Sequence, residues 1–144
     1  MAFNEAEERF LARQVRGHLA TIGSNGGPQV KPVGFSYNKA LGSIDIGGVN
    51  MGESAKFRNV KAHPKVAFVV DEVTGPGADG VHFMEIRGEA ETATGPTDPT
   101  GHLANEIIRI RPRRVISFNI DPGHPGFRAR DLPVRAHGQD DEVA

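Results

Sequence analysis

One stretch of the chain decides the fold: Gly42-Ser-Ile-Asp-Ile-Gly-Gly-Val-Asn-Met-Gly-Glu-Ser-Ala-Lys-Phe-Arg-Asn-Val-Lys-Ala-His63. Ile44 and Ile46 alternate with polar residues, a pattern typical of a half-buried strand. Three glycines follow and allow a sharp turn, after which Glu53 or Ser54 can cap a helix that the next proline ends. The stretch therefore predicts a strand, a glycine turn and a short basic helix.

The start of that helix is a place where an anion can bind. Its first backbone N–H groups have no partner within the helix, and the helix dipole adds partial positive charge. The Ser54 hydroxyl can donate a hydrogen bond there, and Lys56 and Arg58 can add charge-assisted contacts. Glu53 repels an anion unless its side chain points away. Spacing alone leaves open an ordinary surface helix with solvated basic residues, and the stretch is not a Walker-type loop.

A β-hairpin is predicted before this stretch. Residues 19–23 and 30–37 have the pattern of strands on either side of Asn25-Gly26, and Asn-Gly is the strongest short-range hairpin signal. Pro32 removes one donor from the second strand, so we expect it at an edge, at a bulge, or where another group approaches the backbone. A planar ligand ring is one candidate for that group.

The remaining elements follow from the same patterns. An amphipathic helix is predicted over residues 4–16, with Asn4 as its cap, a loop over 71–80 and a helical turn over 102–106. Later strands are predicted at residues 66–70, 81–94, 107–111 and 114–120. The first is apolar throughout, which predicts cover on both faces, either inside a barrel or under a dimer partner, and we favour the dimer partner. The second changes phase near Gly88, as at a bend or bulge of a barrel.

The composition limits the class of protein. A chain of 144 residues has single-domain size, and its net charge of −1 gives no basic field for nucleic acid. It has no cysteine, and its six histidines lack the spacing of a helical metal site, so we predict no metal centre. Acidic N-terminal residues and the lack of a long apolar run predict a cytoplasmic protein without a membrane span. The many short strands predict a mostly β antiparallel barrel.

The central stretch also carries a resemblance. Asn50-Met-Gly-Glu-Ser54-Ala-Lys56-Phe-Arg58-Asn59-Val resembles the phosphate-binding segment of the pyridoxamine 5′-phosphate oxidase-like split β-barrel flavin and deazaflavin proteins. Four further segments occur in the order of that family and at about its spacing: His18-Leu-Ala-Thr-Ile-Gly23, Pro28-Gln-Val-Lys31-Pro32-Val33-Gly-Phe35, Pro64-Lys-Val-Ala-Phe-Val-Val70 and Ile86-Arg-Gly-Glu-Ala90. Within the family the chain looks most like small members thought to use the deazaflavin coenzyme F420.

The resemblance implies a fold and a set of contacts. The fold is a split β-barrel of Greek-key type with a few short helices, a homodimer with the cofactor at the subunit interface. We place the barrel in residues 1–121. Because proline, glycine and charge predominate after it, we expect residues 122–144 to be a tail that is partly disordered or wraps the partner. The implied cofactor residues are Lys31, Ser54, Lys56 and Asn59 on the phosphate side, the backbone of Pro32 and Val33 on the ring side, and Arg58, whose side chain can also face away.

The same resemblance implies an oxidoreductase. Our first interpretation is a homodimer that passes a hydride from reduced coenzyme F420 to a small conjugated organic substrate, with no catalytic residue nominated. One alternative keeps the fold but uses FMN, as an oxidase or reductase of the pyridoxamine 5′-phosphate oxidase type. Another is a non-catalytic module that binds a flavin, haem or deazaflavin.

Two further groups of residues have alternative interpretations. His82, at a strand start beside the predicted loop, is either a proton donor near a ligand or an ordinary, partly exposed strand histidine. The densest positive group of the chain comprises Arg109, Arg111, Arg113 and Arg114. In a dimer these arginines can reach the acidic tail of the partner's cofactor, and otherwise they form a solvated strand face.

Overall fold

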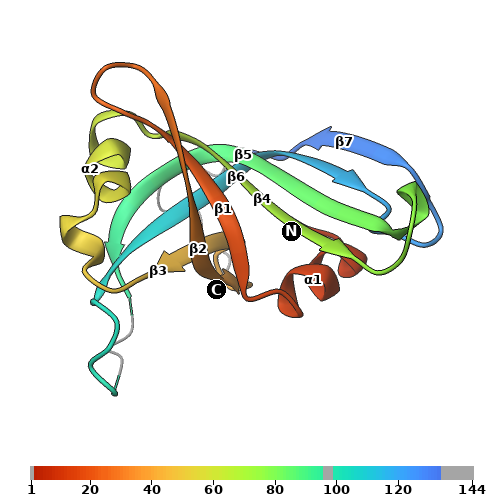
Figure 1. The fold of residues 1–144 in the computed structure, drawn as a ribbon, viewed down its shortest axis with the longest axis horizontal. Coiled ribbons are helices and arrows are strands. Elements are labelled where there is room, and N and C mark those ends of the chain that lie inside the picture. Colours follow the sequence, from red (N-terminus) through yellow and green to blue (C-terminus); the bar gives the residue numbers. More distant parts are fainter. Residues whose placement is uncertain (1, 96–98, 134–144) are drawn as a thin grey trace.

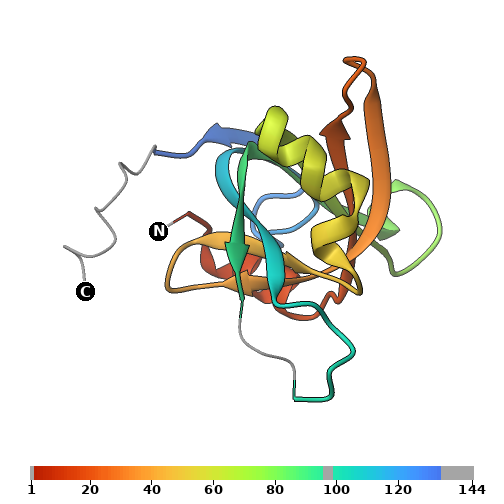
Figure 2. The ribbon, with the colours of Figure 1, turned by 90° about the vertical axis from the view of Figure 1, so that its left-hand side faces the viewer.

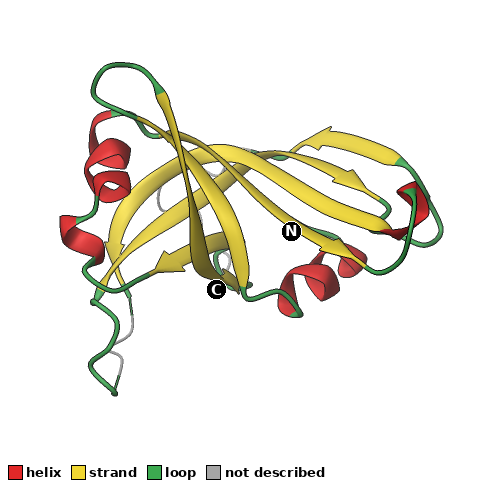
Figure 3. Ribbon diagram, viewed as in Figure 1, coloured by secondary structure: helices red, strands yellow, loops and turns green. Residues whose placement is uncertain are grey.

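The computed structural model describes residues 2–95 and 99–133, which form one barrel with helical segments at its periphery (Figures 1 and 3). In chain order the elements are α1 (Glu5–Ala12), β1 (Arg16–Ile22), β2 (Pro28–Asn38), β3 (Ser43–Gly47), η1 (Met51–Glu53), α2 (Ala55–Ala62), β4 (Lys65–Val73), η2 (Ala78–Gly80), β5 (Val81–Thr94), β6 (Glu106–Phe118) and β7 (Phe127–Asp131), where η marks a short 3₁₀ helix. The predicted strand, turn and helix of the central stretch are therefore confirmed.

The strands form an antiparallel sheet in the order β3-β2-β1-β4-β5-β6-β7, and β3 also pairs with β6. This last pairing closes six strands into a barrel and leaves β7 as an extension beside β6. The neighbours β3-β2-β1-β4 have the spatial order of a Greek key, because the chain returns from β3 past α2 to pair β4 with β1. The predicted mostly β antiparallel barrel is confirmed.

The core fills the inside of this barrel. Ile44 and Ile46 of β3 are fully buried, as their alternation predicts, and Phe68, Ile86 and Ile110 meet them from β4, β5 and β6. Burying apolar side chains of this size stabilises the fold by about 1.5–3 kcal/mol each.

A β-bulge bends the long strands. The register of β5 against β6 shifts between Arg87 and Gly88, which confirms the predicted irregularity. Gly88 lies so close to β6 that a Cβ there would be 2.2 Å from the carbonyl oxygen of Arg111. Its partner across the ladder is Pro112, so the proline falls where the ladder is already irregular. The prediction of two strands separated at Pro112 is wrong, because β6 runs through it.

Other boundaries differ from the predictions. Helix α1 begins with the predicted cap, since Asn4 and Glu7 form a reciprocal capping box, but it ends at Ala12. Val15 consequently lies outside the helix and is 80% exposed, so the predicted extent of the helix to residue 16 is wrong. Residues 102–105 are not helical, and β4 extends into the predicted loop.

The C-terminal part of the chain adds a strand that the sequence patterns did not predict. β7 pairs with β6 from Phe118↔Phe127 to Arg114↔Asp131. Residues 134–144, which hold much of the predicted tail, lie outside the described residues, so the wrapping of a partner stays a prediction.

Candidate functional site

A cleft of about 300 Å³ opens between the β1–β2 hairpin and the start of α2. Figure 2 faces this end of the barrel and shows α2 between the hairpin and strands β5 and β6. The cleft is lined by Thr21, Gln29, Lys31, Pro32, Ser54, Ala55 and Lys56. Four of the seven predicted cofactor residues, Lys31, Pro32, Ser54 and Lys56, thus meet at one place although the hairpin and the helix are distant in sequence.

The local geometry of α2 leaves donors for a ligand. Ser54 caps the helix, because its hydroxyl oxygen accepts the N–H of Phe57 at 3.3 Å. The Ser54 hydroxyl itself donates to the carbonyl oxygen of Met51 at 2.7 Å, so its hydrogen is already used. The preceding N–H groups, those of Ala55 and Lys56, are the orphan donors of the first turn, and both residues line the cleft. The helix therefore offers two backbone donors to the cleft, and Ser54 holds the turn that presents them.

The electrostatics of the cleft favour an anion. Within the described part of the chain, neither Lys31 nor Lys56 has a carboxylate within ion-pair distance. Glu53 is exposed and is not among the residues that line the cleft. Two unpaired ammonium groups beside a helix N-terminus can bind a phosphate in a small volume.

The hairpin contributes an open strand edge. β3 pairs with β2 only over Gly34–Asn38, so the segment Pro28–Val33 has β1 on one side and no strand on the other among the described residues. Pro32 lies in this segment, which confirms its expected edge position. The Val33 side chain is buried in the core, so Val33 can contribute to a ligand site only through its backbone.

The last two predicted residues face other partners. Arg58 is exposed and donates from Nη1 to the carbonyl oxygen of Glu53 at 2.7 Å, outside the cleft lining. Asn59 lies behind the cleft wall, where Nδ2 donates to Thr21 Oγ1 at 3.0 Å and to Gln29 Oε1 at 2.9 Å. The structure thus brings Asn59 to the wall of the cleft without making it part of the lining.

The sequence analysis missed Thr21, Gln29 and Ala55. Thr21 and Gln29 face each other across the hairpin, so extending the pairing outward from the Asn25-Gly26 turn would have placed them together. Ala55 contributes its backbone N–H at the first position of α2, and no side-chain pattern marks such a contribution.

His82 is not part of this cleft. Its Nε2 lies 2.9 Å from Thr74 Oγ1, and its Nδ1 lies 2.7 Å from the carbonyl oxygen of Asn119. These contacts hold the η2 end of the barrel, opposite the end that α2 covers (Figure 1). In the described chain His82 is therefore a structural residue of the far end.

The four arginines of β6 each contact a carboxylate. The pairs are Arg109–Asp45, Arg111–Glu91, Arg113–Glu89 and Arg114–Asp131. The first is bidentate, at 3.0 and 3.1 Å, and only partly exposed. Burial opposes the charge of Asp45, but hydrogen bonds from Arg109, Asn38 and Ser43 outweigh it and lower the pKa of that carboxyl. Contacts from these arginines to a partner's cofactor stay a prediction.

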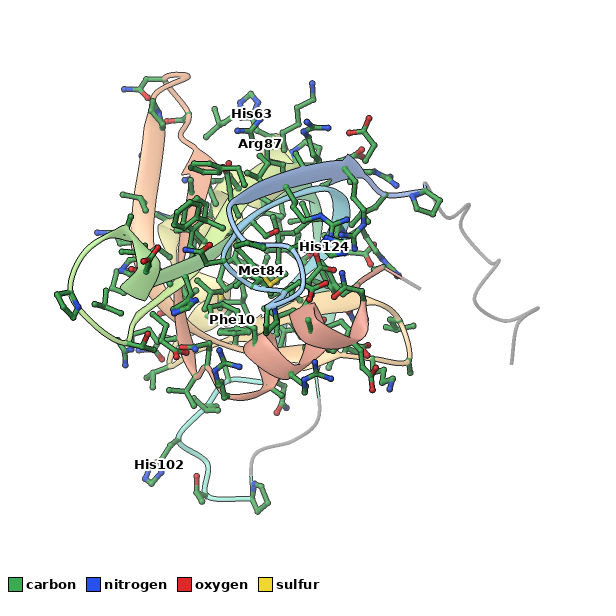
Figure 4. The ribbon with its side chains drawn as sticks, turned by 90° about the vertical axis from the view of Figure 1, so that its right-hand side faces the viewer. Phe10, His63, Met84, Arg87, His102 and His124 are labelled. Carbon is green, nitrogen blue, oxygen red and sulfur yellow. The ribbon has the colours of Figure 1, made fainter. Side chains whose placement is uncertain are left out.

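The described residues contain no group of three or more metal-ligating side chains, and Figure 4 shows His63, His102 and His124 well separated. None of the helices that the structure describes is long and apolar enough to cross a membrane.

Comparison with known proteins places this geometry in a family. The model of the family described as "Pyridoxamine 5'-phosphate oxidase" matches residues 3–122, most of the chain and the whole of the cleft. The chain belongs to this family. A curated member, the 5a,11a-dehydrotetracycline/5a,11a-dehydrooxytetracycline reductase of Streptomyces rimosus subsp. rimosus, is 39% identical over 141 residues, which are 96% of this chain and 99% of that protein.

Several solved structures have a similar fold. The Rv2991 protein of Mycobacterium tuberculosis has a TM-score of 0.66 at 22% identity and covers 94% of each chain. A structure described as an F420 reductase has a TM-score of 0.57 at 25% identity, over 78% of this chain and 98% of that one. A haem-binding protein of Mycobacterium smegmatis, at 13% identity and a TM-score of 0.61, shows the fold alone. The family match, the S. rimosus reductase and the F420 reductase support an oxidoreductase with a flavin or deazaflavin cofactor.

Proposed function

We propose that the protein is a reductase that uses coenzyme F420 and reduces a conjugated carbonyl compound. The observation that carries the proposal is the cleft, where Lys31, Lys56 and two helix N–H groups converge without a carboxylate partner among the described residues. The phosphate of the coenzyme fits this donor set. The likeness to an F420 reductase favours the deazaflavin over FMN, whose phosphate has the same chemistry.

The edge of β2 suits the ring of such a cofactor. Because Pro28–Val33 has a free edge that begins at the cleft, a planar ring attached to the bound phosphate can lie against the backbone at Pro32 and Val33. The cofactor supplies a hydride when reduced, and the protein then has to hold the ring, position the acceptor and exclude water. The described cleft residues bind the phosphate end of the cofactor, so they determine its position and its affinity.

The substrate class follows from the relative. The name of the S. rimosus reductase specifies a dehydrotetracycline, a polycyclic ketone with an additional double bond. A hydride acceptor of this kind has a carbon–carbon double bond activated by conjugation. We propose the same class for this chain, an extended conjugated ketone, without proposing the same compound.

A homodimer completes the proposed site. The outer face of the sheet carries half-exposed apolar side chains, among them Val69 on β4 and Phe83 on β5. At its far end Phe127 is 71% exposed and contacts Phe83. In register, Val69 lies beside His18 and His18 beside Pro32, so this face continues to the rim of the cleft. A second copy packed here would cover apolar surface and reach the cofactor.

Titration tests the cofactor assignment. The purified protein is titrated with coenzyme F420 and, separately, with FMN, followed by fluorescence and calorimetry. We expect tight binding of F420 and weak binding of FMN. The opposite order would replace F420 by FMN in the proposal, and binding of neither would overturn it. Oxidation of the reduced coenzyme is then followed with simple enones and with 5a,11a-dehydrotetracycline, and no turnover with any acceptor would indicate a carrier rather than a reductase.

The dimer has its own test. Val69→Asp places a charge on the outer face beside Glu85, its cross-strand partner. We expect the variant to be monomeric by light scattering and to bind the cofactor more weakly. Val49→Asp, on the loop before η1, changes an exposed valine off the sheet and serves as the control. A monomeric wild-type protein that still binds F420 tightly would contradict the interface.

A further inference from the structure

The side-chain amide of Asn59 connects α2 to the hairpin, and it is the donor in both of its hydrogen bonds there. Nδ2 carries two hydrogens, and its two acceptors are Thr21 Oγ1 and Gln29 Oε1. Both acceptors belong to residues that line the cleft, on neighbouring strands and in register with each other. Asn59 is therefore a donor to the cleft wall on both sides.

Because Thr21 accepts the hydrogen bond from Asn59, its own hydroxyl hydrogen is left for another acceptor. A threonine hydroxyl accepts through its lone pairs and donates once, and the contact with Asn59 uses it as an acceptor. Thr21 is only 3% exposed, and no acceptor for its hydrogen occurs among the residues that the structure describes. A buried hydroxyl hydrogen without an acceptor is costly, and the side of Thr21 that is open is the cleft.

We propose that Thr21 donates a hydrogen bond to the anionic group bound at the start of α2, and that Asn59 is the positioning residue that makes Thr21 a donor. The inference rests on the proposed function, since the anion is the phosphate of F420 or FMN. It also reassigns Asn59, which the sequence resemblance implied as a direct phosphate contact. The site then consists of Lys31, Lys56, two helix N–H groups and the Thr21 hydroxyl.

The arrangement couples the ligand to the packing of α2. Asn59 lies one turn after Lys56 on the same helix, and its amide ties that helix to the β1–β2 hairpin. An anion held by the helix N–H groups and by Thr21 spans the same two elements. Loss of the Asn59 contact lets the Thr21 hydroxyl rotate, so the cofactor loses a fixed donor although no residue that touches it has changed.

The test is a double-mutant cycle on cofactor affinity. Thr21→Val removes the hydroxyl with little change of shape, Thr21→Ser keeps it, and Asn59→Ala removes the positioning amide. We expect Thr21→Val to weaken F420 binding roughly tenfold, because the lost contact is to a charged group, and Thr21→Ser to stay within about threefold. Asn59→Ala should weaken binding several-fold in the wild type and not further in the Thr21→Val background.

A stability measurement separates this role from a structural one. Thermal unfolding of each variant without cofactor is compared with Ser117→Ala, which removes a buried hydroxyl from β6 outside the cleft lining. Unchanged affinity in Thr21→Val, or an Asn59→Ala effect that is the same in both backgrounds, would overturn the proposal. If the valine variant does not fold, Thr21→Ala replaces it, because a smaller side chain cannot overpack the site.

Failure of this inference is distinguishable from failure of the proposed function. Lys56→Ala is titrated beside the other variants. If Lys56→Ala weakens binding and Thr21→Val does not, the cleft is the cofactor site and Thr21 has no donor role. If neither affects the affinity for F420 or FMN, both the site and the role of Thr21 are wrong.

Discussion

Positive charge is used differently at the cleft and along β6. Each of the four arginines of β6 pairs with a carboxylate from a neighbouring strand; they are Arg109, Arg111, Arg113 and Arg114. At the cleft, Lys31 and Lys56 have none among the described residues, although they lie near the N-terminus of a helix. Paired charges hold the sheet together, whereas unpaired ones beside orphan N–H groups raise the affinity for an anion that comes from outside.

The largest expected effect is on the cleft. Lys31→Ala combined with Lys56→Ala removes both ammonium groups from the lining, and we expect cofactor affinity to fall by about 100-fold or more. Thermal stability should hardly change, since neither lysine has an ion-pair partner to lose within the described chain. Lys65→Ala, which removes one exposed lysine outside the cleft lining, is the matched control for each of the two single variants, Lys31→Ala and Lys56→Ala. A large loss of stability with normal affinity would show that the cleft lysines stabilise the fold and do not bind the anion.

The converse experiment is on β6. Arg109→Ala leaves the half-buried Asp45 without its bidentate partner, so we expect the free energy of unfolding in urea to fall by about 2 kcal/mol. Cofactor affinity should remain unchanged, because the guanidinium of Arg109 is already engaged by Asp45, and a loss of affinity would instead favour a contact of Arg109 with a partner's cofactor. Arg87→Ala breaks the exposed pair with Glu85 and should lower the free energy of unfolding by much less than Arg109→Ala does. Equal costs for the two variants would show that burial does not distinguish these pairs.

The Asp45 pair also predicts a pH dependence. The folded-state pKa of Asp45 is lowered, so the unfolded state binds its proton first as the pH falls. The stabilisation is therefore complete above the ordinary carboxyl range, about pH 4, and disappears as the pH falls through the folded-state pKa. We expect Asp45→Asn to lose less stability than the wild type between about pH 5 and pH 2, as measured by urea unfolding at each pH. Parallel curves for the two proteins would contradict the lowered pKa.

The sequence predicted most of what depends on neighbouring residues. The Asn4 cap, the Asn25-Gly26 hairpin and the helix after Ser54 were all found, because their signals lie within a few residues of the structure they form. The continuity of β6 through Pro112 was not found, because a proline is tolerated there only opposite the bulge at Gly88. This pairing depends on a residue of another strand, so no sequence pattern near Pro112 indicates it.

The cleft shows the same limit. The resemblance to a family predicted Lys31 and Lys56 as cofactor residues, and the fold of that family implied that they lie close together. The contact between Asn59 and Thr21 spans 38 positions and depends on how α2 sits against the hairpin. The resemblance implied Asn59 as a ligand candidate, and only the geometry shows that its amide is already engaged on both hydrogens.

The smallest expected effect tests whether the two contacts of Asn59 are equal. Gly23 lies against the hairpin end of Gln29, where an added Cβ would be 2.5 Å from Nε2. Because that amide ends a flexible side chain, Gly23→Ala should displace it at a cost of about 0.5 kcal/mol or less. The displacement weakens the Asn59–Gln29 hydrogen bond and leaves Asn59–Thr21 in place, so F420 affinity should fall only two- to threefold, roughly 0.5 kcal/mol.

Gly75→Ala is the control for that variant, because nothing lies within 4 Å of an added Cβ there and the residue belongs to the loop at the opposite end. If Gly23→Ala weakens binding as much as Thr21→Val, Gln29 is as important a neutral contact as Thr21, since the atoms closest to the added Cβ are those of the glutamine amide. If binding is unchanged, the hydrogen bond to Thr21 alone is enough to fix the wall. Lys31 and Lys56 would then attract the anion, and the single hydrogen bond from the Asn59 amide to Thr21 would fix the geometry of the cleft wall. The unpaired charges of the cleft indicate this division of roles.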